Sequence, residues 1–188
     1  TLTSLLRQTL LFSEKTFIPF REEIEFDRNY LDLTRSRLGT ERFHYTFSGV
    51  EDIHAETPFP ALFLQPILEN ATIHGLSRTG ISHIDIAFRE RKGRLYCTVT
   101  DNGPGLPPSG AGAGENKPAA GETRQSKGIA MLRNKAATLN QLYDLDLKFV
   151  ILNAPDNRGA RAVVSFRTDK AIKAQYRPFT IADKEPFF

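Results

Sequence analysis

The chain has 188 residues and a mass of 21.1 kDa, which suits one ordinary domain with a helical appendage. A hydrophobic fraction of 40% and a charged fraction of 25% exclude a wholly disordered, collagen-like or membrane-embedded chain. The net charge of +3, with acids and bases interspersed, implies no polyanion-binding surface, and the single cysteine excludes an internal disulfide and a cysteine-rich zinc site. The chain starts at Thr1 without a signal-peptide pattern, so we expect it to be a piece of a longer protein.

Residues 1–38 are predicted to form two amphipathic helices, separated near Pro19. The apolar residues that show helical spacing in the first helix are Leu2, Leu5, Leu6 and Leu10. The second helix carries Ile24, Leu31 and Leu38 at heptad spacing. Such a stripe is most often a core-facing surface, and the alternative is a face that packs on a partner helix or subunit.

Short strands and two helices follow as far as residue 168. Alternation of apolar and polar residues predicts strands at 43–47, 84–88, 95–101, 145–152 and 160–167, and the remaining pattern predicts helices at 61–74 and 129–142. Hairpins dominate this order, so we expect a mixed, mostly antiparallel sheet with helices on one face, which is an α+β sandwich. The tail at 169–188 is assigned to no class.

A first cluster of polar residues closes the predicted helix 61–74, in Glu69-Asn70-Ala71-Thr72-Ile73-His74-Gly75. Asn70 and His74 share one helix face, where a carboxamide and an imidazole can meet a hydrated Mg²⁺ ion and phosphate oxygens. Glu69 lies about 100° further round the helix and can poise or deprotonate a nucleophile. If His74-Gly75 is considered without the other residues, we favour the alternative of an ordinary helix C-terminus with Gly75 at the C′ position.

A second cluster, Asp101-Asn102-Gly103-Pro104-Gly105, follows the second strand of a predicted hairpin. A carboxylate there can accept a hydrogen bond from an exocyclic amine such as that of adenine, and glycines let the backbone approach a flat ligand. Asn-Gly and Pro-Gly are also ordinary turn dipeptides, so this cluster alone favours a simple turn.

The third motif, Ser126-Lys127-Gly128-Ile129, is predicted at the start of helix 129–142. Free backbone N–H groups and the helix dipole make such a start an anion site, to which Lys127 adds positive charge. A serine-led helix cap is the alternative. Each motif is common by itself, so the functional prediction depends on the order and spacing of all three.

The segment 106–127 is predicted to be a lid. Seven of the 13 glycines and four of the 11 prolines fall between Gly103 and Gly128. This stretch has almost no large apolar side chain, so burial cannot offset the entropy lost on ordering it. It also exceeds usual loop lengths, which favours a mobile lid that closes over a nucleotide, with an inert insertion as the alternative.

Together the motifs resemble the ATP-binding domain of the GHKL superfamily: E-N-A-x-x-H-G, then D-N-G-P-G, then S-K-G-I after a glycine-rich loop. Upstream residues narrow the resemblance to sensor histidine kinases of the LytS/YehU type. These residues are Leu5–Leu10, Phe17–Ile24, Asn29–Leu31, Arg37–Gly39 and Leu64–Asn70. The resemblance covers roughly residues 1–168 and implies a Bergerat-type sandwich that holds ATP between a helix layer and a flexible lid.

The resemblance implies a role for each residue on the phosphate side. Asn70 would hold a Mg²⁺ ion at the phosphates of ATP, with His74 and Gly75 close by. The Lys127-Gly128-Ile129 run would meet phosphate at a helix start. Glu69 would help to activate the histidine that receives the phosphoryl group.

On the base side, the resemblance implies that Asp101 accepts from the adenine amino group and that Gly103 and Gly105 let the backbone approach the base. The implied activity is that of an ATP-dependent protein-histidine kinase, which transfers the γ-phosphoryl group to a histidine on a dimerisation helix. Positioning and charge stabilisation supply most of such catalysis.

Two departures from the family pattern stand out. The N-P-H-F-L-F-N segment with the phosphorylated histidine is absent, so residues 1–38 are expected to be the end of the dimerisation and phosphoacceptor region plus a linker helix. Ala130 replaces the second glycine of a G-x-G-L sequence, which leaves a non-catalytic nucleotide-sensing or dimerisation module as an alternative. A DNA-repair or topoisomerase type of GHKL ATPase is a third interpretation, and the absence of a basic stripe argues against it.

The resemblance also sets expectations for the parent protein. The expected partners are a phosphoacceptor helix, a response regulator and a second copy in a homodimer, with no nucleic acid. Residues 39–168 would be a cytoplasmic ATP-binding domain of a membrane-anchored bacterial protein. The single cysteine agrees with a reducing compartment.

Overall fold

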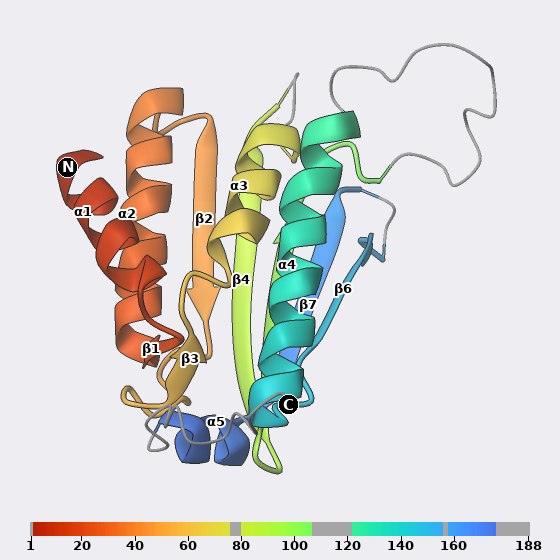
Figure 1. Cartoon of the computed structure of the whole chain (residues 1–188). Helices are drawn as coiled ribbons and strands as arrows, with labels where there is room; N and C mark the ends of the chain where they lie inside the picture. Colours follow the sequence, from red (N-terminus) through yellow and green to blue (C-terminus); the bar gives the residue numbers. More distant parts are fainter. Residues whose placement is uncertain (1, 76–79, 107–121, 156–157, 176–188) are drawn as a thin grey trace.

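A computed structural model of the chain describes residues 2–75, 80–106, 122–155 and 158–175. Figure 1 shows the order and arrangement of the elements in these ranges. The helices are α1 (Leu2–Ser13), α2 (Phe20–Leu38), α3 (Gln65–His74), α4 (Glu122–Tyr143) and α5 (Thr168–Gln175). The strands are β1 (Phe17–Pro19), β2 (Phe43–Ser48), β3 (Pro58–Pro60), β4 (Ser82–Arg91), β5 (Arg94–Asp101), β6 (Lys148–Asn153) and β7 (Ala160–Arg167).

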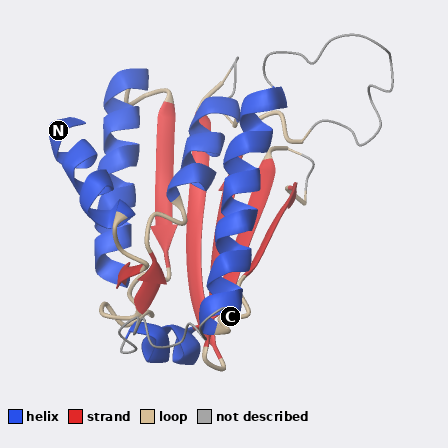
Figure 2. Cartoon of the chain, viewed as in Figure 1, coloured by secondary structure: helices blue, strands red, loops and turns tan. Residues whose placement is uncertain are grey.

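The main sheet has five strands in the order β2-β4-β5-β7-β6. Only the β2–β4 pair is parallel, and the other neighbours are antiparallel. Helices α2, α3 and α4 lie along one face of this sheet, and α5 lies across its lower end (Figure 2). The expectation of an α+β sandwich with a mostly antiparallel sheet is therefore confirmed.

Strand alternation determines which side chains enter the core between the sheet and the helices. In β4, Ile84 and Ile86 are buried, and in β5 the same face carries Cys97 and Val99. Each large apolar side chain buried in this way contributes about 1.5–3 kcal/mol. Asp101 continues the buried series of β5 and pairs with Ile84 across the hairpin, so this carboxylate is turned toward the helices at the end of its strand.

The hairpin between β4 and β5 closes through a two-residue turn. Lys92 and Gly93 are its two loop residues, and both have positive φ angles, of 52° and 69°. This conformation matches the right-handed twist of the flanking strands.

Helix α3 begins at Gln65, four residues later than the predicted start at Ala61. Leu62 has a φ angle of 53°, which a helix does not allow. The N–H groups of Leu62 and Leu64 donate to the Glu23 carboxylate rather than to carbonyls of their own segment. The prediction was wrong here because a side chain from a distant helix decides where α3 starts.

Helix α4 begins at Glu122, so the expected start near Gly128 is wrong. Glu, Arg and Gln favour helix and extend it toward the N-terminus. Gly128 lies within α4, and residues 122–127, expected to be part of the lid, form its first turns. The remainder of the expected lid, 107–121, lies outside the described residues.

Three elements were not predicted. Strands β1 and β3 have three residues each, form an antiparallel pair and contain prolines, so they show no periodicity from which to predict them. Helix α5 starts directly after β7, in the tail that was assigned to no class. In the described ranges, no helix combines the length and the hydropathy that a membrane span needs.

Candidate functional site

The three motifs lie at one edge of the sandwich. They stand at the C-terminal ends of α3 and β5 and in the N-terminal part of α4. Figure 1 shows the C-terminal end of α3 beside the N-terminal end of α4. Helix α3 contacts both α4 and β5. The first and second motifs are therefore brought together, as the sequence predicts.

Asp101 lies at the base of this edge and is only 7% exposed. Its Oδ1 atom accepts from the backbone N–H of Gly103 at 2.9 Å and from that of Ala160 at 3.1 Å. These two donors come from the loop after β5 and from the start of β7. The carboxylate is thus held by backbone on two sides, and both donors reach Oδ1 rather than Oδ2.

Gly75 and Gly103 permit a close contact between the end of α3 and the end of β5. A Cβ atom on Gly75 would lie 2.6 Å from Asp101 Cγ, and one on Gly103 would lie 2.4 Å from the Gly75 carbonyl oxygen. Gly75 has a φ angle of −81°, so it is not the left-handed C′ residue of the alternative considered above. Chain packing is thus a sufficient reason for glycine at both positions.

Gly159 was missed as a site residue, although its segment was predicted as a turn. Its φ angle is 93°, and a Cβ atom would lie 1.7 Å from the Asp101 carbonyl oxygen. Next to it, Gly105 has a φ angle of 77°, and the Leu106 N–H donates to Asn153 Oδ1 at 2.7 Å. The ends of β6 and β7 therefore belong to the same edge, which only their pairing with β5 reveals.

The Asn102 side chain forms its hydrogen bonds with residues at the beginning of β4. Its Oδ1 accepts from the His83 N–H at 2.8 Å, and its Nδ2 donates to the Ile81 carbonyl at 2.9 Å. The residue therefore ties the end of β5 to the beginning of β4, and it holds the loop that follows Asp101.

Glu69, Asn70 and His74 are half-buried on α3. Asn70 and His74 are one turn apart, as predicted, and Glu69 Oε1 accepts from Gln65 Nε2 at 2.9 Å. Among the described residues, no three acidic, histidine or cysteine side chains are grouped so as to hold a metal ion. A single carboxamide such as that of Asn70 suits an ion held mainly by phosphates and water.

The third motif lies within α4 rather than at its first turn. A Cβ atom on Gly128 would meet nothing within 4 Å, and Ile129 is half-buried. Met131 is 72% exposed. The Lys127 side chain lies outside the described residues. The N–H groups without a partner inside α4 are those of residues 122–125. Gly128 therefore does not provide the free N–H groups of a helix start, on which the predicted anion site depended.

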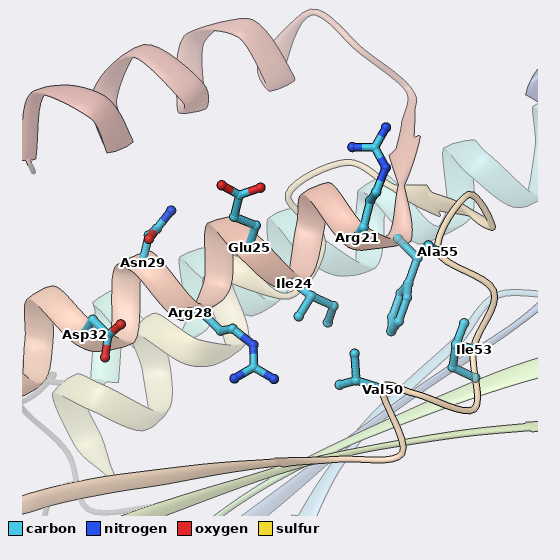
Figure 3. A pocket seen from close by; sticks show the side chains of 10 residues that line it. Arg21, Ile24, Glu25, Arg28, Asn29, Asp32, Val50, Ile53 and Ala55 are labelled. Carbon is cyan, nitrogen blue, oxygen red and sulfur yellow. The ribbon is translucent and has the colours of Figure 1, made fainter.

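A separate cavity of about 440 Å³ lies between α2 and the loop after β2. Figure 3 shows Ile24 and Arg28 pointing into it from α2, opposite Val50 and Ile53. The Arg28 guanidinium stacks on Phe47 at 4.4 Å from the ring centroid. No residue of the three clusters at 69–75, 101–105 and 126–129 lines this cavity, so it is not part of the candidate site.

No protein-family model matches the chain. In sequence, it is 34% identical over 94 residues to the sensor histidine kinase YesM of Bacillus subtilis, a match that covers 50% of this chain and 16% of that protein. It is 30% identical over 107 residues to the sensor protein LytS of Enterococcus faecalis, covering 56% of this chain and 18% of that protein. The chain spans between 16% and 38% of the length of the curated relatives it matches.

Among solved structures, the histidine kinase domain of the blue-light activated kinase of Erythrobacter litoralis EL346 matches with a TM-score of 0.53 and 15% identity, over 91% of this chain and 68% of that one. The catalytic domain of the histidine kinase ThkA matches with a TM-score of 0.52 and 14% identity, over 81% of this chain and 97% of that one. At these identities the structures establish the fold alone. The resemblance seen in the motifs is thereby confirmed: the chain has the fold of a histidine kinase catalytic domain and is related in sequence to the LytS and YesM sensor histidine kinases.

Proposed function

We propose that this chain is the ATP-binding catalytic part of a two-component sensor histidine kinase. It transfers the γ-phosphoryl group of ATP to a histidine on a helix outside this chain. The observation that carries the proposal is the buried Asp101 carboxylate, held by two backbone N–H groups at the point where α3 meets β5. The sequence likeness to YesM and LytS supports the same conclusion.

Asp101 binds the adenine amino group in this proposal. Because Gly103 and Ala160 orient Oδ1, Oδ2 is the oxygen that accepts from a ligand. A fixed acceptor selects adenine, which presents an amine, over guanine, which presents a carbonyl at the same position. Gly105 and the hydrogen bond from the Leu106 N–H to Asn153 lie next to Asp101, where they would contact the base.

Asn70 and His74 bind the phosphate side. Their half-buried position on one face of α3 supports a contact with a hydrated Mg²⁺ ion and with phosphate oxygens. When bound, the ion supplies positive charge that offsets the charge of the phosphates. Asn70 contributes a neutral oxygen, so it orients the ion without adding negative charge near the phosphoryl group.

Glu69 acts on the phosphoacceptor. It is adjacent to Asn70 and projects from a different face of α3, and its carboxylate is oriented by Gln65. A carboxylate near the receiving imidazole keeps a ring nitrogen free to attack the γ-phosphorus. The segment 106–121 is proposed to be a lid that closes over the nucleotide, next to the N-terminal turns of α4.

The proposal extends to the parent protein as a homodimer that acts with a response regulator. We further propose a membrane anchor outside this chain, with the catalytic part in the cytoplasm. Sequence likeness to LytS sensor proteins supports both statements.

The test combines the purified chain with γ-labelled ATP, Mg²⁺ and a separate helical hairpin that contains an N-P-H-F-L-F-N segment. Acid-labile label should appear on the hairpin histidine and should be lost in Glu69→Gln. Glu25→Gln, an exposed change on α2, should leave transfer unaltered. ATP binding without transfer to a hairpin that another kinase can phosphorylate would instead support the non-catalytic nucleotide-sensing module. A chain that binds no ATP would contradict both functions.

A further inference from the structure

Helix α2 buries two carboxyl groups that have no role in the proposed site. Glu23 and Asp27 are one helical turn apart, and each is 0% exposed. Acidic side chains are almost never fully buried unless they are paired or hydrogen-bonded. The two residues differ in this respect: Glu23 has partners, whereas neither Asp27 oxygen has a hydrogen-bond partner within the described part of the chain.

Glu23 caps helix α3 from outside that helix. Its Oε2 accepts from the Leu62 N–H at 2.9 Å, and its Oε1 accepts from the Leu64 N–H at 3.2 Å. Leu64 is the N-cap residue of α3 and makes no side-chain capping bond of its own. A negative charge at this end also complements the helix dipole. Glu23 therefore replaces the missing cap and holds Leu62 in its positive-φ conformation.

Lys135 holds the same loop from the other side. It is half-buried on α4, its Nζ donates to the Ala61 carbonyl, and its charge interacts with Glu23. The segment 61–64 is thus fixed between α2 and α4. Helix α3 is only about 15 Å long, so a shift at its start carries over to Asn70 and Glu69.

We propose that Glu23, together with Lys135, is a positioning residue for the phosphate side of the nucleotide site. The inference rests on the proposed function and adds a residue outside the site that determines the position of Asn70 and Glu69. Glu23 sets the axial position of α3 and thereby of Asn70 and Glu69. The base side depends on it less, because Asp101 is held by Gly103 and Ala160, which belong to other elements.

The environment of Glu23 gives this arrangement a pH dependence. Burial raises the pKa of Glu23 to about 7, against the lowering effects of the backbone N–H groups and Lys135. The groups that face Glu23 are Asp27 on its own helix, Lys135 on α4 and the backbone N–H groups of the loop 62–64. Burial raises the pKa of the Cys97 thiol on β5, and the charges of Asp27 and Glu23 raise this pKa further. A protonated Glu23 has one acceptor oxygen fewer for the two N–H groups, so the cap weakens as the pH falls through neutrality.

The test compares two ligands in Glu23→Gln and in the matched control Glu25→Gln. In Glu23→Gln, the affinity for Mg²⁺–ATP should fall by about tenfold, the effect of losing one charge-assisted hydrogen bond, while the affinity for adenosine should change less than about twofold. The wild-type affinity for Mg²⁺–ATP should rise with pH near 7, and this rise should disappear in Glu23→Gln. The control should behave as wild type.

Lys135→Met provides a second arm that does not remove the cap itself. It should raise the pH at which Mg²⁺–ATP affinity rises, because the cation no longer stabilises ionised Glu23. In either variant, the NMR signal of the Asn70 side-chain amide should shift more than that of the Ala160 backbone N–H. This readout needs no bound nucleotide.

Equal losses for both ligands, or no loss for either, would overturn the inference while leaving the proposed function intact. A wild-type chain that binds neither ligand would overturn the proposed function and this inference with it.

Discussion

The proposed base side and the proposed phosphate side of the site are built by different physical means. The base side is a sheet edge, where β5 and β7 hold Asp101 through short-range backbone hydrogen bonds and close glycine contacts. The phosphate side is a short helix held at one end by the buried Glu23 carboxylate and Lys135. The sheet edge holds its carboxylate with backbone N–H groups, which do not titrate, whereas the capped helix depends on Glu23, whose pKa burial raises to about 7. The phosphate side is therefore the part of the site that pH or a nearby change can adjust.

The largest effect is expected from Gly103→Val, which tests whether the base side is rigid. A Cβ atom there would lie 2.4 Å from the Gly75 carbonyl oxygen, with no flexible side chain to yield. We expect a loss of about 3 kcal/mol or more in the free energy of unfolding, together with loss of adenosine binding. Chemical denaturation and calorimetry provide the two measurements.

The matched control for that substitution is Gly128→Ala. Gly128 lies within α4 and a Cβ atom would meet nothing within 4 Å, so this change should stabilise the chain by up to about 1 kcal/mol. A destabilising result would contradict the helical conformation at Gly128.

The next largest effect is expected for Asp101→Asn, which removes a charge from the base side without changing its shape. The amide can still accept from Gly103 and Ala160 through one oxygen, but its NH₂ group would face the adenine amine. ATP affinity should drop by about 2–3 kcal/mol, while the free energy of unfolding changes by less. Equal affinity for ATP in wild type and variant would show that Asp101 does not contact the base.

A third substitution, Asp27→Leu, addresses the buried charges under the phosphate side. Burial and the nearby Glu23 raise the pKa of Asp27 well above its usual value. Above the unfolded pKa, near 4, the unfolded chain releases a proton that the folded chain keeps, so stability falls as pH rises toward the folded pKa. Leucine removes this dependence and should increase the free energy of unfolding by about 1–3 kcal/mol at pH 8.

Urea denaturation at pH 4.5 and pH 8 measures the difference. The gain should be smaller at pH 4.5, because this pH lies only slightly above the unfolded pKa and keeping the proton in the folded state costs less free energy there than at pH 8. A gain that does not depend on pH would mean that Asp27 does not titrate differently in the two states.

The smallest effect is expected for Thr72→Val, which breaks the hydrogen bond of 2.8 Å between the Thr72 and Tyr30 hydroxyls. This bond joins α3 to α2 beside Glu69. Its loss should reduce the free energy of unfolding by about 1 kcal/mol. Tyr30→Phe removes the same bond from the other side, and the double variant should lose less stability than the sum of the two single losses. Strict additivity would indicate that the two hydroxyls do not interact in solution.

Local sequence was sufficient for several parts of this structure. Alternation in 84–88 and 95–101 predicts the central hairpin, because the pleat of a strand turns every second side chain to the same face. The two residues between these strands, Lys92 and Gly93, are the number that a tight hairpin turn needs, and the structure gives both positive φ angles. The same reasoning puts Asp101 at the end of a buried strand, and the order of the three motifs was enough to indicate the family.

Only the tertiary structure decided the rest. Helix α3 starts at Gln65 because a carboxylate 39 residues earlier in the chain accepts the Leu62 N–H, a contact that no local pattern encodes. Gly159 belongs to the site because β7 pairs with β5 and brings it against Asp101. Periodicity reports which face of an element is apolar, but it does not report which distant group satisfies a backbone donor or fills the space beside a glycine. Those two relations, between α2 and α3 and between β5 and β7, determine where the residues of the candidate site lie.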